Sequence, residues 1–115
     1  MDMDEKVFPK IITSLPEADI DFPGVTIKIL QGKHNQVAFC HMEESGEAGE
    51  HVHGPQWGIV VEGEIDLTIN GEKRIYKKGD SYYIPDGAPH SGKSKAGNYS
   101  IDFFAEPDRY KLKEE

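Results

Sequence analysis

Two histidines separated by one residue, His51 and His53, have the spacing that most directly suggests chemistry in this chain. If they lie on a β-strand, both side chains point to the same face of the sheet. A third histidine, His90, follows in a segment rich in glycine and proline. Imidazole is the commonest protein ligand for transition metals, so the three rings could form one face of a metal site.

The chain has 115 residues, of which 37% are hydrophobic, so we expect a single domain over residues 1–115 with a packed core. The formal net charge is −8. That charge argues against a nucleic-acid partner, which favours a basic surface, and gives no reason to expect binding to an anionic membrane. Cys40 is the only cysteine, which excludes an internal disulfide and favours a reducing compartment. The acidic start of the chain and the lack of a long apolar run predict a cytoplasmic protein.

Apolar residues recur with a period of two, which is typical of half-buried strands. Asn70 and Gly71 follow one such run and predict a tight hairpin whose return strand contains Ile75 and Tyr76. The other expected strands are residues 25–29, 36–42, 57–61, 65–69, 81–84 and 99–104. Many short strands predict an all-β sandwich or barrel, and no long helix is expected. Residues 107–112 could form one turn, and the charged ends, roughly 1–10 and 111–115, are expected to be loose.

The segments 45–63 and 79–90 resemble the two sequence motifs of the cupin family. The second motif is matched at Gly79, Pro85, Gly87 and His90, with Ser94 in place of its final asparagine. In the first motif, Ser45 replaces the opening glycine, and Gln56 takes the place of a glutamate ligand, counted back from Gly63. The resemblance implies a single-domain, antiparallel jelly-roll β-barrel with its core at about residues 22–105. Cupins of this size often form dimers, so a homodimer is expected.

By the same resemblance, His51, His53, Gln56 and His90 would be metal ligands. Three imidazoles and an amide oxygen make a neutral set, so a divalent ion would keep its full charge and be a stronger Lewis acid, but it would be bound less tightly. The ion would be a divalent transition metal: Zn, Ni, Fe, Mn or Co. The alternative for Gln56 is a hydrogen bond to water in the pocket.

Asp102 lies in an alternating strand, and the alternation alone leaves open whether it points into the barrel or to solvent. A carboxylate beside a metal-bound water could act as a general acid or base. Residues 101–109 also resemble the C-terminal stretch of small cupins of pectin and alginate breakdown, which convert 4,5-unsaturated uronates to linear ketonic products. That resemblance implies proton transfer by Asp102 and binding of a substrate carboxylate by Arg109. An exposed Arg109 in a charged tail is the alternative.

Other polar and aromatic residues have simpler interpretations. His34 falls in a turn and is expected at the surface, whereas His41 is expected to be a structural histidine. Four aromatic residues are either core or pocket walls: Trp57, Tyr82, Tyr83 and Phe104. Four glutamates are expected to form a solvated loop before His51: Glu43, Glu44, Glu47 and Glu50.

Three functions follow from these residues. The first is an enzyme that uses a divalent metal as a Lewis acid on a small polar acid or sugar, for example in the ring opening or isomerisation of an unsaturated uronate. The second is an Fe(II)-dependent dioxygenase. The third is a non-catalytic module that binds or senses a small ligand, with no membrane or nucleic-acid partner of its own.

Overall fold

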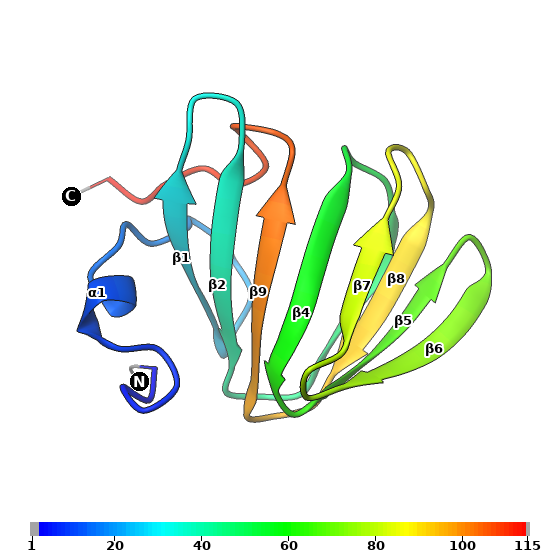
Figure 1. Cartoon of the computed structure of the whole chain (residues 1–115), viewed down its shortest axis with the longest axis horizontal. Helices are drawn as coiled ribbons and strands as arrows, with labels where there is room; N and C mark the ends of the chain where they lie inside the picture. The colour runs from blue at the N-terminus through cyan, green and yellow to red at the C-terminus, as the bar shows by residue number, and fades with distance from the viewer. Residues whose placement is uncertain (1–2, 115) are drawn as a thin grey trace.

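The computed structural model describes residues 3–114, which form two antiparallel sheets and one short helix (Figure 1). The larger sheet has the order β1-β2-β9-β4-β7 and the smaller β3-β8-β5-β6. The strands of the larger sheet are β1 (Val25–Gln31), β2 (Gln36–Met42), β9 (Asn98–Phe104), β4 (Gln56–Glu62) and β7 (Ser81–Ile84). Those of the smaller are β3 (Gly46–His51), β8 (His90–Ser94), β5 (Glu64–Ile69) and β6 (Glu72–Lys77). This architecture confirms the predicted all-β jelly-roll.

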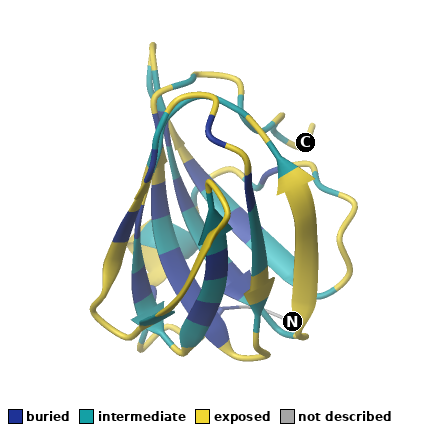
Figure 2. Cartoon of the chain, turned by 90° about the vertical axis from the view of Figure 1, so that its right-hand side faces the viewer, coloured by how far each residue is buried: buried dark blue, intermediate teal, exposed yellow. Residues whose placement is uncertain are grey.

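Buried residues alternate with more exposed ones along the strands, as the period of two predicts (Figure 2). The inward side chains form two clusters, one that joins the two sheets and one in which the larger sheet packs against the chain segments before β1 and after β9. Val60 and Tyr82 of the larger sheet pack with Ile65 and Leu67 of the smaller one. The Asn70-Gly71 turn has φ of 51° and 80°, as a tight hairpin turn requires.

Two strands were missed in the sequence, and both carry histidines of the candidate site. The glutamates before His51 do not all lie in a loop, because Glu47 and Glu50 belong to β3. This strand hides almost no side chain, so its sequence lacks the alternation that indicates a strand. It is held by backbone pairing with β8.

The prediction of loose chain ends is wrong for residues 3–10 and 111–114, whereas residues 1–2 and 115 of that prediction lie outside the described residues. Met3 and Phe8 are 4% and 3% exposed, and the Phe8 ring packs edge-on against Phe39 and Tyr99. The helix α1 (Lys10–Thr13) follows this packed segment. At the other end, residues 107–112 turn without forming a helix, and Leu112 pairs with Ala18 in an isolated bridge. A few apolar side chains in otherwise charged segments are buried at both ends, and this burial holds the segments against the rest of the protein.

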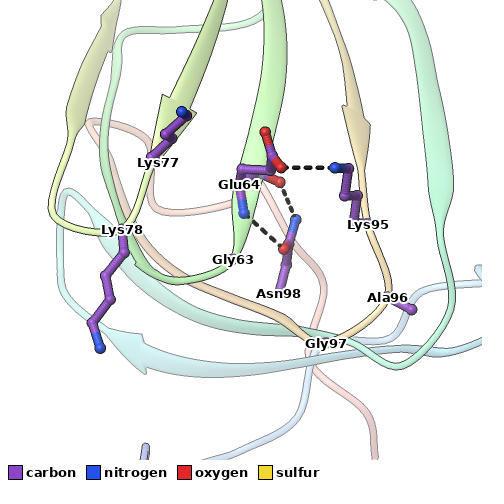
Figure 3. A pocket seen from close by; sticks show the side chains of 8 residues that line it. All are labelled: Gly63, Glu64, Lys77, Lys78, Lys95, Ala96, Gly97 and Asn98. Carbon is purple, nitrogen blue, oxygen red and sulfur yellow. Dashed lines mark hydrogen bonds and ion pairs between the residues drawn. The ribbon is translucent and has the colours of Figure 1, made fainter.

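The turn before β5 explains the glycine that closes the first motif. Gly63 has a φ of 90°, and a Cβ there would lie 1.9 Å from the Asn98 side-chain oxygen. That oxygen accepts a hydrogen bond from the Glu64 backbone, and Asn98 donates one back to the Glu64 carbonyl (Figure 3). The exchange ties the start of β5 to the start of β9, and Lys95 pairs with the Glu64 carboxylate beside it.

No helix among residues 3–114 is long and apolar enough to cross a membrane.

Candidate metal centre and its cavity

The three histidines of the sequence analysis converge in space. His51 ends β3, His90 begins β8 directly opposite it, and His53 follows in the loop that leads to β4. One ring nitrogen from each of the three lies within 4.8 Å of the others. His90 is only 4% exposed, whereas the other two are half-buried. The predicted cluster of three rings is present, but the strand spacing expected for His51 and His53 is not the reason. The β3–β8 pair supplies His51 and His90, and the loop after β3 brings His53 to them.

Hydrogen bonds orient all three rings in the same way. Each Nδ1 lies 2.7 to 2.9 Å from a backbone carbonyl oxygen, those of Gly49, Gly54 and Ala88 for His51, His53 and His90. A carbonyl can only accept, so each Nδ1 carries the proton and donates it. The lone pair of each ring is then on Nε2, the tautomer that a metal ligand needs.

The distance between two of these nitrogens tests whether an ion fits. His53 Nε2 and His90 Nε2 are 3.1 Å apart. With both protons on Nδ1, the two lone pairs face each other, which is favourable only with a cation between them. Two nitrogens each about 2.0–2.1 Å from one ion are about 2.8–3.4 Å apart at angles near 90–110°. Burial lowers the pKa of both histidines, which favours the neutral ligating form. The donor set therefore fits a divalent transition metal, and nothing in it selects one.

Gln56 begins β4 and lines the same cavity as the histidines. Its amide nitrogen donates a hydrogen bond of 2.8 Å to Asp102 Oδ1. That bond leaves the amide oxygen as the atom that could bind a metal. The role of Gln56 as a fourth ligand stays a prediction.

Asp102 points into the barrel, which resolves the alternative that the sequence left open. The residue is 5% exposed, and its neighbour Phe103 points outward at 40%. Tyr82 donates to Oδ1 over 2.5 Å, and Ser100 donates to Oδ2 over 3.2 Å. The Cys40 thiol lies 3.9 Å from Oδ2. Burial raises the pKa of the Asp102 carboxyl, and the hydrogen bonds from Tyr82 and its other donors oppose that shift.

Gly58 was missed in the sequence and is essential to this arrangement. It lies opposite Asp102 on β9 and opposite Tyr82 on β7. A Cβ at Gly58 would lie 2.2 Å from Asp102 Oδ1 and 2.3 Å from the Tyr82 ring. The glycine thus makes room for the Tyr82–Asp102 hydrogen bond. A glycine inside a strand pattern is the signal that could have identified it.

Arg109 lines the cavity and does not extend into solvent as a free tail. Its guanidinium lies 4.7 Å from the centre of the Tyr110 ring and 5.7 Å from that of Phe104. Its Nε is buried and makes no hydrogen bond with the described residues. The arginine is therefore positioned in the lining of the cavity by two aromatic faces.

Glu106 also belongs to the site and was not identified from the sequence. Its carboxylate accepts a hydrogen bond of 2.7 Å from the Gly54 backbone and lies 3.8 Å from His53 Nδ1. It therefore fixes the loop that carries His53. No pattern in the sequence points to this contact.

The cavity has a volume of about 1060 Å³ and extends between the two sheets. Among the described residues that line it, Arg109 is the one lysine or arginine, whereas several lining residues are acidic: Asp19, Asp21, Glu44, Glu47 and Asp102. Of the four predicted aromatic residues, Tyr82 and Phe104 line the cavity, whereas Trp57 and Tyr83 point outward at 44% and 58% exposure.

The remaining histidines lie as expected. His34 is exposed in the turn between β1 and β2. His41 is 8% exposed, stacks on Tyr99 with ring centres 4.0 Å apart, and bonds to the Asn98 carbonyl.

Comparison with curated proteins finds the HTH-type transcriptional regulator PuuR of Escherichia coli K12, 49% identical over 75 residues. The PuuR of Shigella flexneri matches equally well. The aligned part is 59% of this chain and 40% of each regulator, so the chain spans less than half the length of these relatives.

Among solved structures, KdgF from Halomonas sp. matches with a TM-score of 0.71 and 25% identity, over 84% of this chain and 89% of that one. An RmlC-like cupin from Shewanella frigidimarina NCIMB 400 matches with a TM-score of 0.71 and 26% identity, over 84% and 87% of the two chains. The salicylate 1,2-dioxygenase of Pseudaminobacter salicylatoxidans shares the fold at a TM-score of 0.66 and 20% identity, over 79% of this chain and 31% of that one.

The comparison with protein families agrees with these structures. The cupin domain matches residues 38–97, more than half of the chain, from within β2 to the residue before β9. The matched part contains all three histidines of the cluster and Gln56. This protein is a member of the cupin family.

Proposed function

We propose that this cupin is a metal-dependent enzyme that transforms a small polar molecule, an acid or a sugar, inside its cavity. One observation carries the proposal. A buried carboxylate and the three-histidine cluster line one cavity, and Gln56, predicted as a ligand, donates a hydrogen bond to that carboxylate, Asp102. Burying a carboxylate disfavours its charge, and such groups are concentrated at functional sites.

The chain's own residues would divide the work as follows. The Nε2 atoms of the cluster and the Gln56 oxygen would hold a divalent ion, which when bound supplies Lewis acidity to a hydroxyl or carbonyl oxygen. Asp102 would hold or transfer a proton at its carboxylate, which accepts hydrogen bonds from Tyr82 and Gln56. Arg109 would bind a carboxylate through its planar guanidinium.

The most concrete substrate is a 4,5-unsaturated uronate, by the resemblance to the small cupins of pectin and alginate breakdown. Such a molecule carries one carboxylate, which matches one arginine in a cavity otherwise lined by acidic side chains. Those acids repel a ligand with several negative charges, so the proposal is limited to a monoanion or a neutral sugar. A place in carbohydrate metabolism is a prediction that depends on this activity, and a cytoplasmic location stays a prediction from the sequence.

The test is to remove metal with a chelator, reload separate samples with Zn, Ni, Fe, Mn or Co, and add a 4,5-unsaturated uronate. Loss of the ultraviolet absorbance of its double bond reports the reaction. We expect turnover only in a metal-loaded form and a fall of about 10² or more in Asp102→Asn. Asp108→Asn, an exposed acid in the same segment, is the control and should behave as wild type. Absence of any metal-dependent rate would refute the enzyme proposal for this substrate.

A second candidate is a non-catalytic module that binds or senses a small ligand. The observation that favours it is the 49% identity to HTH-type transcriptional regulators. The absence of a nucleic-acid partner was predicted from the net charge alone, and the similarity to transcriptional regulators gives it no support. A sensor predicts that ligand raises the melting temperature of wild type and Asp102→Asn alike, without turnover. The likeness to a dioxygenase at 20% identity supports only the fold, and oxygen uptake with Fe(II) would be the test for that activity.

A further inference from the structure

Glu106 places a carboxylate against one histidine of the cluster. Its Oε1 lies 3.8 Å from His53 Nδ1. This is the side of the ring away from Nε2, the nitrogen that faces His90 and would bind a metal. Glu106 does not line the cavity, whereas all three histidines do. The carboxylate therefore acts on a ligand of the site and is not a ligand itself.

The end of β9 brings Glu106 to this position. β9 and β4 are antiparallel neighbours, so the chain that leaves β9 runs beside the loop that enters β4 (Figure 1). The Ala105 backbone donates a hydrogen bond of 3.1 Å to the Pro55 carbonyl. The next residue, Glu106, accepts one of 2.7 Å from the Gly54 backbone. Two successive residues thus tie the segment after β9 to the loop that carries His53.

The contacts around His53 leave its ring little freedom. Its Nδ1 donates to the Gly54 carbonyl over 2.7 Å, and its own carbonyl accepts from the Gly87 backbone over 3.0 Å. Glu106 holds the N–H of the same Gly54. A Cβ at Gly54 would lie 2.7 Å from the Glu106 carboxylate, so a glycine is needed for this approach. Of these contacts, the one from Glu106 brings a negative charge.

A negative charge at this place offsets a property of the predicted ligand set. Three imidazoles and one amide are neutral, so no ligand compensates the charge of a divalent ion. A nearby anion stabilises such an ion, and a partner on the far nitrogen of a ligating imidazole orients the ring and makes the ligating nitrogen more basic. The Glu106 side chain is 32% exposed, so water screens part of this effect.

We propose that Glu106 is a positioning residue of the metal centre, which fixes His53 through the Gly54 backbone and supplies negative charge beside a neutral ligand set. This inference rests on the metal centre of the proposed function. It makes the affinity for metal depend on the segment after β9 as well as on the histidines. Glu106 would offset part of the affinity that the neutral ligand set loses.

Zinc affinity tests the role of the charge, measured on the full chain by competition with a chromophoric chelator. Glu106→Gln keeps an oxygen that can accept the Gly54 hydrogen bond but removes the charge, and it should weaken zinc binding about tenfold. Glu106→Ala removes both and should weaken it more, toward about a hundredfold. Glu72→Gln is the control, because Glu72 is exposed at the start of β6 and its loss changes the net charge equally. It should bind zinc as wild type.

A second readout needs no metal and reports the positioning role. Hydrogen exchange of the Gly54 amide should be slow in wild type and in Glu106→Gln, and faster in Glu106→Ala. Equal exchange in Glu106→Ala and wild type would overturn the proposal, as would equal zinc affinity of Glu106→Gln and wild type. In both cases a wild type that binds zinc leaves the metal centre standing. A wild type that binds no zinc refutes the metal centre and this inference with it.

Discussion

Replacing Gly58 by alanine should disrupt the Asp102 network although it adds only one methyl group. The new Cβ would meet Asp102 Oδ1 at 2.2 Å and the Tyr82 ring at 2.3 Å, and both neighbours are buried. Neither is the end of a flexible surface chain, so at least one must move. Overpacking of this kind costs about 1–3 kcal/mol, and weakening a hydrogen bond to a charged group costs about 1.5–3 kcal/mol. We therefore expect a loss of about 3 kcal/mol, a large part of the usual 5–15 kcal/mol of domain stability.

The measurement is urea unfolding followed by circular dichroism, with thermal melting as a second readout. A loss of about 3 kcal/mol corresponds to a fall in melting temperature of roughly 10–20 °C for a domain of this size. Gly49→Ala is the control, because Gly49 is also in a strand and a Cβ there meets nothing within 4 Å. It should leave stability within about 0.5 kcal/mol of wild type or raise it slightly. If Gly58→Ala were as stable as Gly49→Ala, the close approach of Gly58, Asp102 and Tyr82 would be wrong.

Further predictions concern single contacts and the metal. Tyr82→Phe removes a hydrogen bond to the buried Asp102 carboxylate and should lower the free energy of unfolding by about 1.5–3 kcal/mol, measured by urea titration. The control is Tyr83→Phe, because Tyr83 is exposed on the same strand. It should change the free energy of unfolding by less than about 0.5 kcal/mol. The pKa of the Glu17 carboxyl is lowered, mainly by a hydrogen bond from Lys113. This ion pair therefore stabilises the fold at pH values above the unfolded-state pKa of glutamate. The stabilisation is lost as the pH falls through the lowered pKa of the folded state. Glu17→Gln should therefore cost about 0.5 kcal/mol at pH 6 and nothing at pH 2.5, and an equal cost at both would contradict it. Chelation should lower the melting temperature of metal-loaded protein, and metal at about 100 times its dissociation constant should restore about 2.7 kcal/mol; calorimetry showing no binding would refute the metal centre.

Much of the fold could be predicted from local patterns. The Asn70-Gly71 turn and the alternating runs around it identified β5 and β6, because both signals depend on neighbouring residues. The spacing of histidine, glycine and proline residues identified the three-histidine cluster for the same reason, because a sequence motif depends on residues that lie in the same turn or at the end of the same strand. Alternation also placed Asp102 and Phe103 on opposite faces, although it could not say which face was inside.

What the sequence could not give are contacts between distant segments. The Glu106 carboxylate reaches the Gly54 backbone across a sequence separation of 52 residues, and no local pattern encodes that approach. The strand β3 was missed because its side chains are exposed and its hydrogen bonds are backbone bonds to β8. Phe8 was assigned to a loose end because its partner, Tyr99, comes from the last strand. In each case the stabilising partner lies far along the chain.

The two halves of the candidate site belong to different sheets, and this determines how it can be perturbed. His51 and His90 come from the smaller sheet, whereas Gln56 and Asp102 come from the larger one. The separation of the histidine cluster from the carboxylate is therefore set by the packing between the sheets, where Val60 and its neighbours meet Ile65 and Leu67. Closely packed interiors transmit changes in volume, so a substitution in that core can move the two halves apart without touching either. The geometry of the cavity therefore depends on how both sheets pack. Gln56 should respond most to such a shift, because it lines the same cavity as the histidines and donates a hydrogen bond to Asp102.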